Sequence, residues 1–557
     1  MYIICHTVAM VDAKSLDHTP ALPARPAPRP RSAWDAWGTK SAALPTGARP
    51  VLSMLLKGTA HPVARVPLDR VRLTASTATA EDIAALRDAV GSDEADSRVS
   101  ADDAVRLLHL GGKSTPDLLA RRSFDEQSAP DLVVSAADHD DVARVIAVCR
   151  DRSLAVVPFG GGTSVVGGVQ PERGEHRAVI ALDLSPTAAL LELDDVSLLA
   201  RFGAGTTGPQ AEELLAEYGF TLGHFPQSFE YASLGGYAAT RSSGQASRGF
   251  GRFDDLVHGM RVATPVGDID LGRAPASAAG PDLRQVFLGS EGAFGVITEV
   301  VVRIRPLAAV RGYGAWSFPT FESGATALRV VTQAGLRPTV LRLSDESETR
   351  VNAALGAHLR TMRGALAIAT FEGASQQEVD AVATATAAIF RAHGAKARGE
   401  DRARSWERGR FHSPALRDTL LDAGVLAETL ETATTWSALP ELYARVSAAL
   451  TAALTAEGTP PVIMCHISHV YPAGASLYFT VVAALTEQPA SQWAAAKRAA
   501  SDAIAESGAT ITHHHAVGAD HRPWFADEIG DTGVRILRAI KAELDPTGIL
   551  NPGTLIP

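Results

Sequence analysis

The sequence predicts an α+β protein with two main domains and a C-terminal helix that returns to the first domain. Three observations predict this class. The 557 residues suffice for two to four domains, and 46% hydrophobic with 20% charged residues is ordinary for a globular chain. Short apolar strands and glycine-rich loops occupy 129–306. Strand and helix patterns alternate after Pro306, as expected for an α/β cap with an antiparallel sheet.

Composition excludes several kinds of partner and site. The net charge of −10 comes without a basic run, so we expect no nucleic-acid partner. Three cysteines form neither a disulfide framework nor a Cys-based zinc site, which favours a reduced, cytoplasmic protein. No stretch has the pattern of a membrane span, because residues 458–486 are interpreted as two strands and a turn. The first ten residues lack the features of a signal peptide, and whether they belong to the native protein is left open.

The N-terminal region, residues 1–128, is predicted to be an arm followed by helices. Residues 11–50 are rich in proline, which favours an extended, poorly ordered arm, and Trp34 and Trp37 could strap it to the surface. Residues 80–125 have a helical pattern that breaks at Gly111-Gly112.

Residues 129–306 mix helices with short strands. Asp138 is a predicted helix cap, and Val142, Val145, Ile146 and Cys149 share one face of the helix after it. Further elements are expected as strands at 154–158, 178–184 and 196–202, a helix at 209–218 and a closing strand at 300–304.

Residues 307–530 are predicted to form the cap domain, and 531–557 to pack back on the first domain. Cap strands are expected at 312–317, 339–343, 365–371, 462–468 and 476–482, with helices near 321–335, 376–393, 440–456 and 490–507. The last helix, 532–547, has apolar positions Val534, Ile536, Leu537, Ile540 and Leu544 and ends at Asp545-Pro546.

Three loops rich in glycine and hydroxyl side chains indicate a site for a flat ring and a pyrophosphate. The first runs from Pro158 to Ser164, where glycines let backbone N–H groups converge on an anion; a plain tight turn is the alternative. The others are 226–244 and 289–298. The segment 203–208 also matches a dinucleotide fingerprint, which we reject because Pro209 follows it and Glu230 lies in a loop.

The order of these loops resembles the FAD-binding domain of the vanillyl-alcohol-oxidase/PCMH flavoproteins, over about 129–306. The resemblance implies a two-part FAD domain with the FAD facing the cap. The sequence has no clear anchoring residue, so we expect the FAD to be bound non-covalently. The residues it implies for FAD binding are Pro158, Phe159, Gly160, Gly161, Gly162, Thr163, Ser164, Val165, Gln227, Ser228, Phe229, Glu230, Tyr231, Ala232, Ser233, Gly236, Thr240, Arg241, Ser242, Ser243, Glu291, Gly292, Ala293, Phe294, Gly295, Val296 and Ile297.

The run His513-His514-His515 is the second signal. In an extended chain His513 and His515 would face one side and His514 the other, so we predict no metal bound by all three. The run offers tunable donors near developing charge, or it is a polar loop without a role. Together with Ala516-Val517-Gly518 it is similar to the His-His-His-Gly-Val-Gly motif of the alkyldihydroxyacetonephosphate synthases, although Ala516 stands where that motif has Gly.

Within that family the resemblance assigns further roles. It implies exchange of the acyl chain of acyl-dihydroxyacetone phosphate for a fatty alcohol, through an adduct on the flavin N5. Tyr478 would be the acid/base, aided by cationic or His neighbours, with His513, His514, His515, His224 and Arg342 also catalytic. Arg417 and Arg342 would bind phosphate, because a guanidinium matches phosphate oxygens bidentately; each could instead form a surface ion pair. A lipid substrate suggests peripheral contact with a membrane, and a homodimer is left open.

The alternative is an FAD-linked oxidase or dehydrogenase of a 2-hydroxy acid or another alcohol on the same scaffold. Such enzymes typically have a His…Asn-Leu-His metal site and a Glu-His-Gly-Ile-Gly segment. Here Tyr478 takes the place of the second metal His and His514 that of the Glu, so we predict that this metal site is lost. His466 with His469 could still bind a metal in another way.

Overall fold

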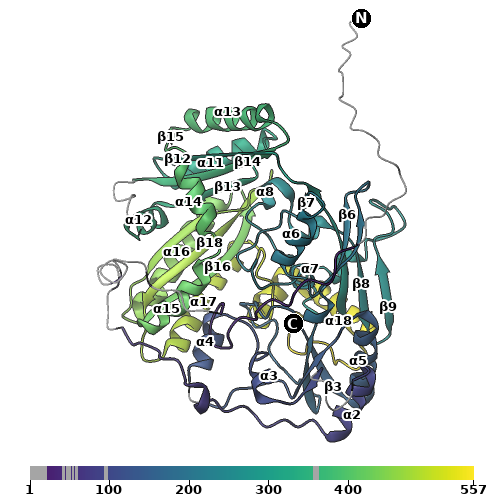
Figure 1. Ribbon diagram of the computed structural model, residues 1–557. Coiled ribbons are helices and arrows are strands. Elements are labelled where there is room, and N and C mark those ends of the chain that lie inside the picture. Colours follow the sequence, from purple (N-terminus) through teal and green to yellow (C-terminus); the bar gives the residue numbers. More distant parts are fainter. Residues whose placement is uncertain are drawn as a thin grey trace, which may run out of the picture.

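The computed structural model describes residues 22–39, 44, 52, 56, 60–92, 98–123, 125–355 and 363–557. The expectations for residues 1–10 and for the start of the proline-rich arm lie outside these ranges. Figure 1 shows a sheet-and-helix layer holding β12, β14, β16 and β18 beside a region holding β6, β8 and β9. The predicted α+β class is confirmed, with a two-part first domain and an antiparallel cap sheet.

The first half of 129–306 supplies three strands of a four-stranded sheet in the order β1-β2-β4-β3, and β1 comes from the N-terminal region. Its central strands are parallel, and β1 is antiparallel to β2. Asp138 caps the long helix by accepting from the N–H of Asp141, as predicted. The elements are β1 Val99–Ser100, β2 Leu132–Ser135, α5 His139–Arg152, β3 Leu154–Phe159 and β4 Ala178–Asp183.

The second half contains a five-stranded antiparallel sheet in the order β5-β6-β10-β8-β9. The antiparallel pairing of β6 agrees with rejecting a dinucleotide fold at 203–208, which needs a parallel strand. The predicted strand at 196–202 begins at Leu199, and β5 before it was not predicted. The elements are β5 Leu190–Asp194, β6 Leu199–Gly203, α6 Gly208–Ala216, β7 Phe220–Thr221, α7 Leu234–Thr240, α8 Ser247–Phe250, α9 Phe253–Leu256, β8 Val257–Thr264, β9 Gly267–Leu271, α10 Arg284–Phe287, β10 Val296–Arg303 and β11 Arg305–Pro306.

The cap is a seven-stranded antiparallel sheet in the order β15-β12-β14-β13-β17-β18-β16. The five predicted strands are present, and β16 is an additional long strand. The strands are β12 Val310–Phe318, β13 Val340–Ser344, β14 Ala365–Gly373, β15 Lys396–Ala397, β16 Val425–Thr435, β17 Val462–Ile467 and β18 Gly474–Ala484.

Helices cover both faces of the cap sheet. Trp316 packs in the main core with Phe390 of α13, whereas its neighbour Ala315 packs on the opposite face against Ala403 of α14. The helices are α11 Phe321–Gln333, α12 Glu346–Leu355, α13 Gln376–Ala392, α14 Asp401–Gly409, α15 Ser413–Asp422, α16 Leu439–Ala456 and α17 Pro489–Glu506. No helix among the described residues is long and apolar enough to span a membrane.

The C-terminal helix α18, Arg522–Leu544, begins ten residues earlier than predicted and breaks at Gly530, whose φ is +67°. Leu537, Ile540 and Leu544 pack against the core of the second half-domain, but Ile536 is exposed, contrary to its predicted apolar position. After the helix, Leu550 is buried beside β3. The chain therefore returns to the first domain through its C-terminal segment.

The N-terminal arm runs over both domains. Arg25 donates to the carbonyl of Pro186, whereas the backbone N–H of Trp37 donates to Asp418 of the cap at 2.5 Å. Trp34 packs on Leu107, and Trp37 is buried. The helical region predicted after the arm consists of α2 Ala80–Ala89, α3 Asp103–Leu107 and α4 Thr115–Arg121, with η1 Leu68–Arg70 before them and η2 Ser185–Thr187 later in the chain.

Candidate active site

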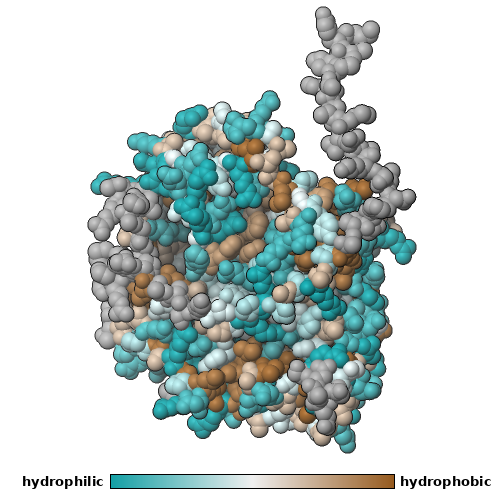
Figure 2. Space-filling view, viewed as in Figure 1, coloured by the Kyte–Doolittle hydropathy of each residue, from teal (hydrophilic) through white to brown (hydrophobic). Residues whose placement is uncertain are grey.

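A cavity of about 1190 Å³ is lined by residues of both domains and of the arm. On the face seen in Figure 2 the surface is mainly hydrophilic, with smaller apolar patches. One wall of the cavity consists of the three glycine-rich loops, and the other is the α14 face of the cap sheet. The volume exceeds that of most small-molecule pockets, so the cavity has room for a dinucleotide together with a substrate.

Most residues that the resemblance implies for FAD binding do line this cavity. Backbone of the loop after β3 and several hydroxyl groups face it, which suits the phosphates and ring edge of FAD. The implied residues at the wall are Pro158, Gly160, Gly161, Gly162, Thr163, Ser164, Val165, Gln227, Ser228, Ala232, Ser233, Gly236, Thr240, Ser242, Ser243, Glu291, Gly292, Gly295, Val296 and Ile297.

Seven of the implied residues do not line the cavity, because six of their side chains have other partners and the seventh is exposed. Phe159 packs on His109, Phe229 stacks on Phe411, and Tyr231 meets the edge of Trp37. Arg241 donates to Leu288 and Gln285, Glu230 is exposed, and both Ala293 and Phe294 are part of the core. These side chains support the loops rather than forming the wall.

Two glycines of the first loop are required by packing between loops. A Cβ on Gly161 would overlap the carbonyl oxygen of Tyr231, and one on Gly160 would overlap the hydroxyl of Ser233. The sequence predicted that these glycines allow a ligand to approach the backbone. In the structure their lack of a side chain also lets the loop after β3 lie directly against the loop before α7.

A row of polar side chains crosses the cap sheet at the cavity. Ser344 of β13 is opposite His466 of β17, and His466 is opposite Tyr478 of β18. Tyr478 is in turn opposite Glu431 of β16. Residues that face one another across antiparallel strands lie on the same face of the sheet. The register of four strands therefore places these four residues side by side.

Burial makes Tyr478 a weak acid in this structure. Burial raises the pKa of Tyr478 to about 12, although a hydrogen bond with Thr429 partly offsets this. The sequence predicted basic neighbours that would help it act near neutral pH. Its ring does lie among imidazoles, because it stacks on His466 with centroids 4.8 Å apart and also contacts His514 and His515. Burial lowers the pKa of all three imidazoles, so they are not cationic neighbours at neutral pH. Tyr478 is thus protonated at neutral pH, so it can act as a proton donor before it acts as a base.

Arg342 lines the cavity and is held by a buried carboxylate. Its Nη2 donates to Oε1 of Glu348 at 2.5 Å, and Nδ1 of His466 lies 3.3 Å from Oε2. Burial opposes the ionisation of Glu348, but Arg342 and His466 outweigh it and lower the pKa of Glu348 to about 2. Arg342 is therefore already paired before any substrate arrives.

Arg417 lies on α15, is mostly buried and faces the same cavity. Its Nη2 is 3.6 Å from Asp418, and its Nη1 is 4.0 Å from Glu428. Among the described residues, neither Nε nor Nη2 has a hydrogen-bond partner. A buried guanidinium with unpaired N–H groups is costly unless a ligand completes it, so Arg417 suits an anion better than Arg342 does.

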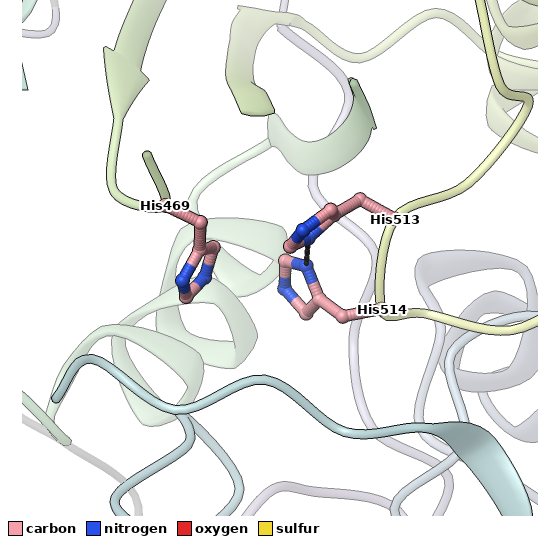
Figure 3. A group of neighbouring side chains, drawn as sticks. All are labelled: His469, His513 and His514. Atoms are coloured by element: carbon pink, nitrogen blue, oxygen red, sulfur yellow. Dashed lines mark hydrogen bonds between the residues drawn. The ribbon is translucent and has the colours of Figure 1, made fainter. Parts of the chain in front are cut away.

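The His run is bent, not extended as expected, and two of its rings converge (Figure 3). The Nδ1 atoms of His513 and His514 are 3.0 Å apart, and the ring of His469 stacks on His513 at 5.0 Å. One nitrogen from each of the three lies within 4.8 Å of the others, close enough to hold a metal ion. The opposite facing expected for an extended run therefore does not apply to this bent segment, and the group that could hold a metal contains His469 in place of His515. Burial lowers the pKa of His513, His514 and His515 to about 4.

His224 is close to the site but not on its wall. It is packed between the rings of Tyr237 and Phe253, and its Nε2 lies 3.0 Å from the hydroxyl of Ser242, which does line the cavity. Burial lowers its pKa to about 3. In this structure His224 is connected to the cavity wall through Ser242. His513 is also set back, while His514 and His515 line the cavity.

Sequence reasoning missed two buried acids, Glu348 and Glu431. Both are at ordinary-looking positions, one in the first turn of α12 and one in a threonine-rich strand. A single sequence gave no sign that their carboxylates are buried. The signal for Glu348 was its place just after the Arg342 segment, but its pairing with His466 depends on the register of β13 and β17.

The comparisons with known proteins agree with this geometry. A model of the FAD binding domain matches residues 130–271, and a model of the C-terminal domain of FAD-linked oxidases matches 307–555. The alkyldihydroxyacetonephosphate synthase of Trypanosoma brucei brucei is 33% identical over 483 residues, which cover 83% of this chain and 78% of that protein. The chain belongs to the alkyldihydroxyacetonephosphate synthase family. It is thus an FAD-dependent enzyme.

Two further members of the family match over most of the chain. The synthase of Dictyostelium discoideum is 31% identical over 82% of this chain and 78% of its own length. A solved structure of alkyldihydroxyacetonephosphate synthase superposes with a TM-score of 0.81 at 26% identity, covering 94% of this chain and 98% of that one. Membership in the family therefore extends to both domains.

Proposed function

We propose that the protein makes an alkyl-dihydroxyacetone phosphate by exchanging the acyl chain of its acylated precursor for a long-chain alcohol. One observation carries this proposal. Tyr478, Arg417 and His514 reach the same cavity as the glycine-rich FAD loops. An acid, an anion-binding group and a neutral imidazole are the groups that this exchange requires beside the cofactor.

The phosphate is assigned to Arg417. Arg417 lines the cavity, and its nearest carboxylates, 3.6 and 4.0 Å away, are beyond hydrogen-bond distance, so its guanidinium is the better candidate to match two phosphate oxygens. Arg342 already forms an ion pair with Glu348. We therefore assign it a secondary role, in which it orients the substrate beside His466. In this arrangement the two arginines approach the headgroup from α15 and β13.

The alkyl and acyl chains are assigned to the apolar part of the same sheet face. Moving along the strands away from Tyr478 and His466, the cavity wall changes to Met464 with Thr480 and then to Val462 with Val482. Leu366 and Ile368 of β14 extend it. A lipid can thus place its polar head at the His and Tyr row and its chain along the strands. Contact with a membrane surface, from which such lipids come, is part of this proposal.

The proton transfers are assigned to Tyr478 and the neutral imidazoles. His514 and His515 can accept the proton from the substrate carbon, because burial keeps both rings uncharged at neutral pH. Tyr478 can donate a proton to the leaving carboxylate. FAD, when bound, supplies an oxidised ring that can accept an electron pair from the substrate carbon.

An exchange assay tests the proposed function. The FAD-loaded enzyme is mixed with acyl-dihydroxyacetone phosphate and labelled hexadecanol, and we expect label in the ether product with release of fatty acid. The parallel reaction offers 2-hydroxy acids with a dye acceptor, and we expect no dye reduction. Dye reduction without exchange would instead identify the enzyme as an oxidoreductase.

A further inference from the structure

Glu431 has an unusual set of hydrogen-bond donors. Its carboxylate is buried in β16 and accepts from the Thr512 hydroxyl at 2.6 Å. It also accepts from three consecutive backbone N–H groups, those of His513 at 2.7 Å, His514 at 3.1 Å and His515 at 2.9 Å. Because each of these groups donates toward it, the site favours the ionised carboxylate, which has only acceptor atoms.

These hydrogen bonds explain the bend in the His run. In an extended strand successive N–H groups point in opposite directions, so three in a row cannot reach one carboxylate. A run of N–H groups that curves around an anion is a known alternative backbone geometry. The bend brings His514 over Tyr478 with ring centroids 6.0 Å apart, and turns His515 edge-on to Tyr478 at 5.6 Å.

The position of Glu431 in the sheet fixes this arrangement relative to Tyr478. Glu431 is directly opposite Tyr478 across β16 and β18. The register of the sheet therefore places the backbone segment that donates to Glu431 beside Tyr478. Its oxygens are also 3.5 Å from Nδ1 of His514 and 3.9 Å from Nδ1 of His515.

We propose that Glu431 is the positioning residue of this active site, holding the His run in the bend that sets His514 and His515 against Tyr478. It contacts neither the cavity nor the reacting atoms and acts through the two imidazoles. The expected effect of Glu431 on turnover rests on the proposed function. Its expected effect on the conformation of the His run does not. Burial opposes its ionisation, but the imidazoles and Thr512 hold the pKa of Glu431 well below its ordinary value.

The test compares Glu431→Gln with Glu528→Gln in the FAD-loaded enzyme. Glu528 of α18 is the matched control, since it accepts from the N–H of Ile511 and the hydroxyl of Thr510, just before the same run, without touching a His. In Glu431→Gln one oxygen becomes an amide that faces N–H donors. We expect kcat to fall about 100-fold with KM changed less than threefold, as for loss of one catalytic proton transfer. Glu528→Gln should keep kcat within about twofold.

Hydrogen exchange and the flavin spectrum provide readouts that need no turnover. Peptides covering 512–515 should exchange at least about tenfold faster in Glu431→Gln than in wild type or Glu528→Gln, since their acceptor is lost. The visible spectrum of bound FAD should shift in Glu431→Gln alone. If the wild-type enzyme does not incorporate the labelled alcohol, the proposed function fails. Hydrogen exchange of the peptides and the flavin spectrum still decide the role of Glu431.

The outcomes are distinct. A Glu431→Gln enzyme that loses melting temperature but keeps kcat and the flavin spectrum would overturn the proposal, because Glu431 would then only stabilise the fold. Should that variant not fold, Glu431→Asp keeps the charge but withdraws it by one methylene group. The Glu431→Asp enzyme should bind FAD and have a lower kcat with an unchanged KM. An unchanged kcat in this variant would equally overturn the proposal.

Discussion

At the scale of single residues, neighbours decide what each side chain can do. Tyr478 was predicted as an acid/base from the resemblance alone, and its neighbours in the structure make it a donor that keeps its proton at neutral pH. Arg342 and Arg417 looked equivalent in the sequence. The structure distinguishes them, because Arg342 is paired with Glu348 while Nε and Nη2 of Arg417 lack hydrogen-bond partners among the described residues.

Replacing Tyr478 with phenylalanine should remove the proton donor and keep its packing. The ring would still stack on His466, so we expect FAD content and melting temperature close to wild type. Alcohol exchange should fall by about 10²–10⁴-fold, the usual contribution of a general acid. The measurement is labelled alcohol incorporation at saturating substrate. Exchange within threefold of wild type would remove Tyr478 from the proposed mechanism.

Replacing Glu348 with glutamine should release Arg342 from its fixed position. The neutral amide still accepts one hydrogen bond but no longer fixes the guanidinium by charge. We expect KM for the phosphate substrate to rise about tenfold, which corresponds to one lost charge-assisted contact, with a smaller change in kcat. Steady-state kinetics check this, and Glu322→Gln on the exposed start of α11 is the control. An unchanged KM would mean that Arg342 is not used for substrate binding.

At the scale of elements, the strongly patterned segments were predicted well. Strands with clean apolar patterns, such as β3 and β14, and amphipathic helices such as α13 have nearly their predicted bounds. The strand β16 was missed, because its Glu428, Glu431 and threonines resemble a polar surface segment. Their burial depends on partners in α4 and in the His run, which lie far away in the sequence.

The loop after β3 gives a prediction at this scale. Gly161→Ala would force the loop away from the carbonyl of Tyr231, with which the new methyl group overlaps. Because the contact is with backbone, relief requires the two FAD loops to separate. We expect a loss of about 1–3 kcal/mol in the free energy of unfolding, typical of overpacking, and at least tenfold weaker FAD binding. Thermal melting and FAD titration measure these two effects.

The control for that variant is Gly409→Ala. A Cβ at Gly409 meets nothing within 4 Å, and its φ is not in the left-handed region. Its melting temperature should stay within about 2 °C of wild type, because the added methyl group meets no atom. If Gly161→Ala melted like this control, the two loops would not be packed as the structure has them.

At the scale of the whole molecule, several imidazoles are buried in the uncharged form. Burial lowers the pKa of His109, His224, His513, His514, His515 and His521 to about 3–4. In the unfolded chain the same groups take up protons below about pH 6.5. The unfolded state thus binds more protons between these values, and the free energy of unfolding falls as the pH drops from 6.5 toward 4.

The expected result is acid lability under mild conditions. Burial raises the pKa of Glu291 to about 7 and that of Asp345 to about 6, which acts in the opposite direction, but six imidazoles outnumber these two carboxyl groups. We expect the melting temperature to fall by roughly 5 °C or more between pH 7 and pH 5. Calorimetry at constant ionic strength and saturating FAD measures this. A melting temperature that is flat or rising over that interval would contradict it.

The sequence by itself determined the fold class and the three glycine-rich loops that line the cavity. These follow from local patterns, since apolar periodicity specifies strands and helices, and glycine with hydroxyl side chains specifies close backbone approach. Only the tertiary structure decided which side chains meet. The row from Ser344 to Glu431 needs the register of four strands, and the bend of the His run needs a carboxylate 82 residues earlier in the chain. Burial then raises the pKa of Tyr478 and keeps the imidazoles uncharged, and a linear sequence does not contain the extent of burial.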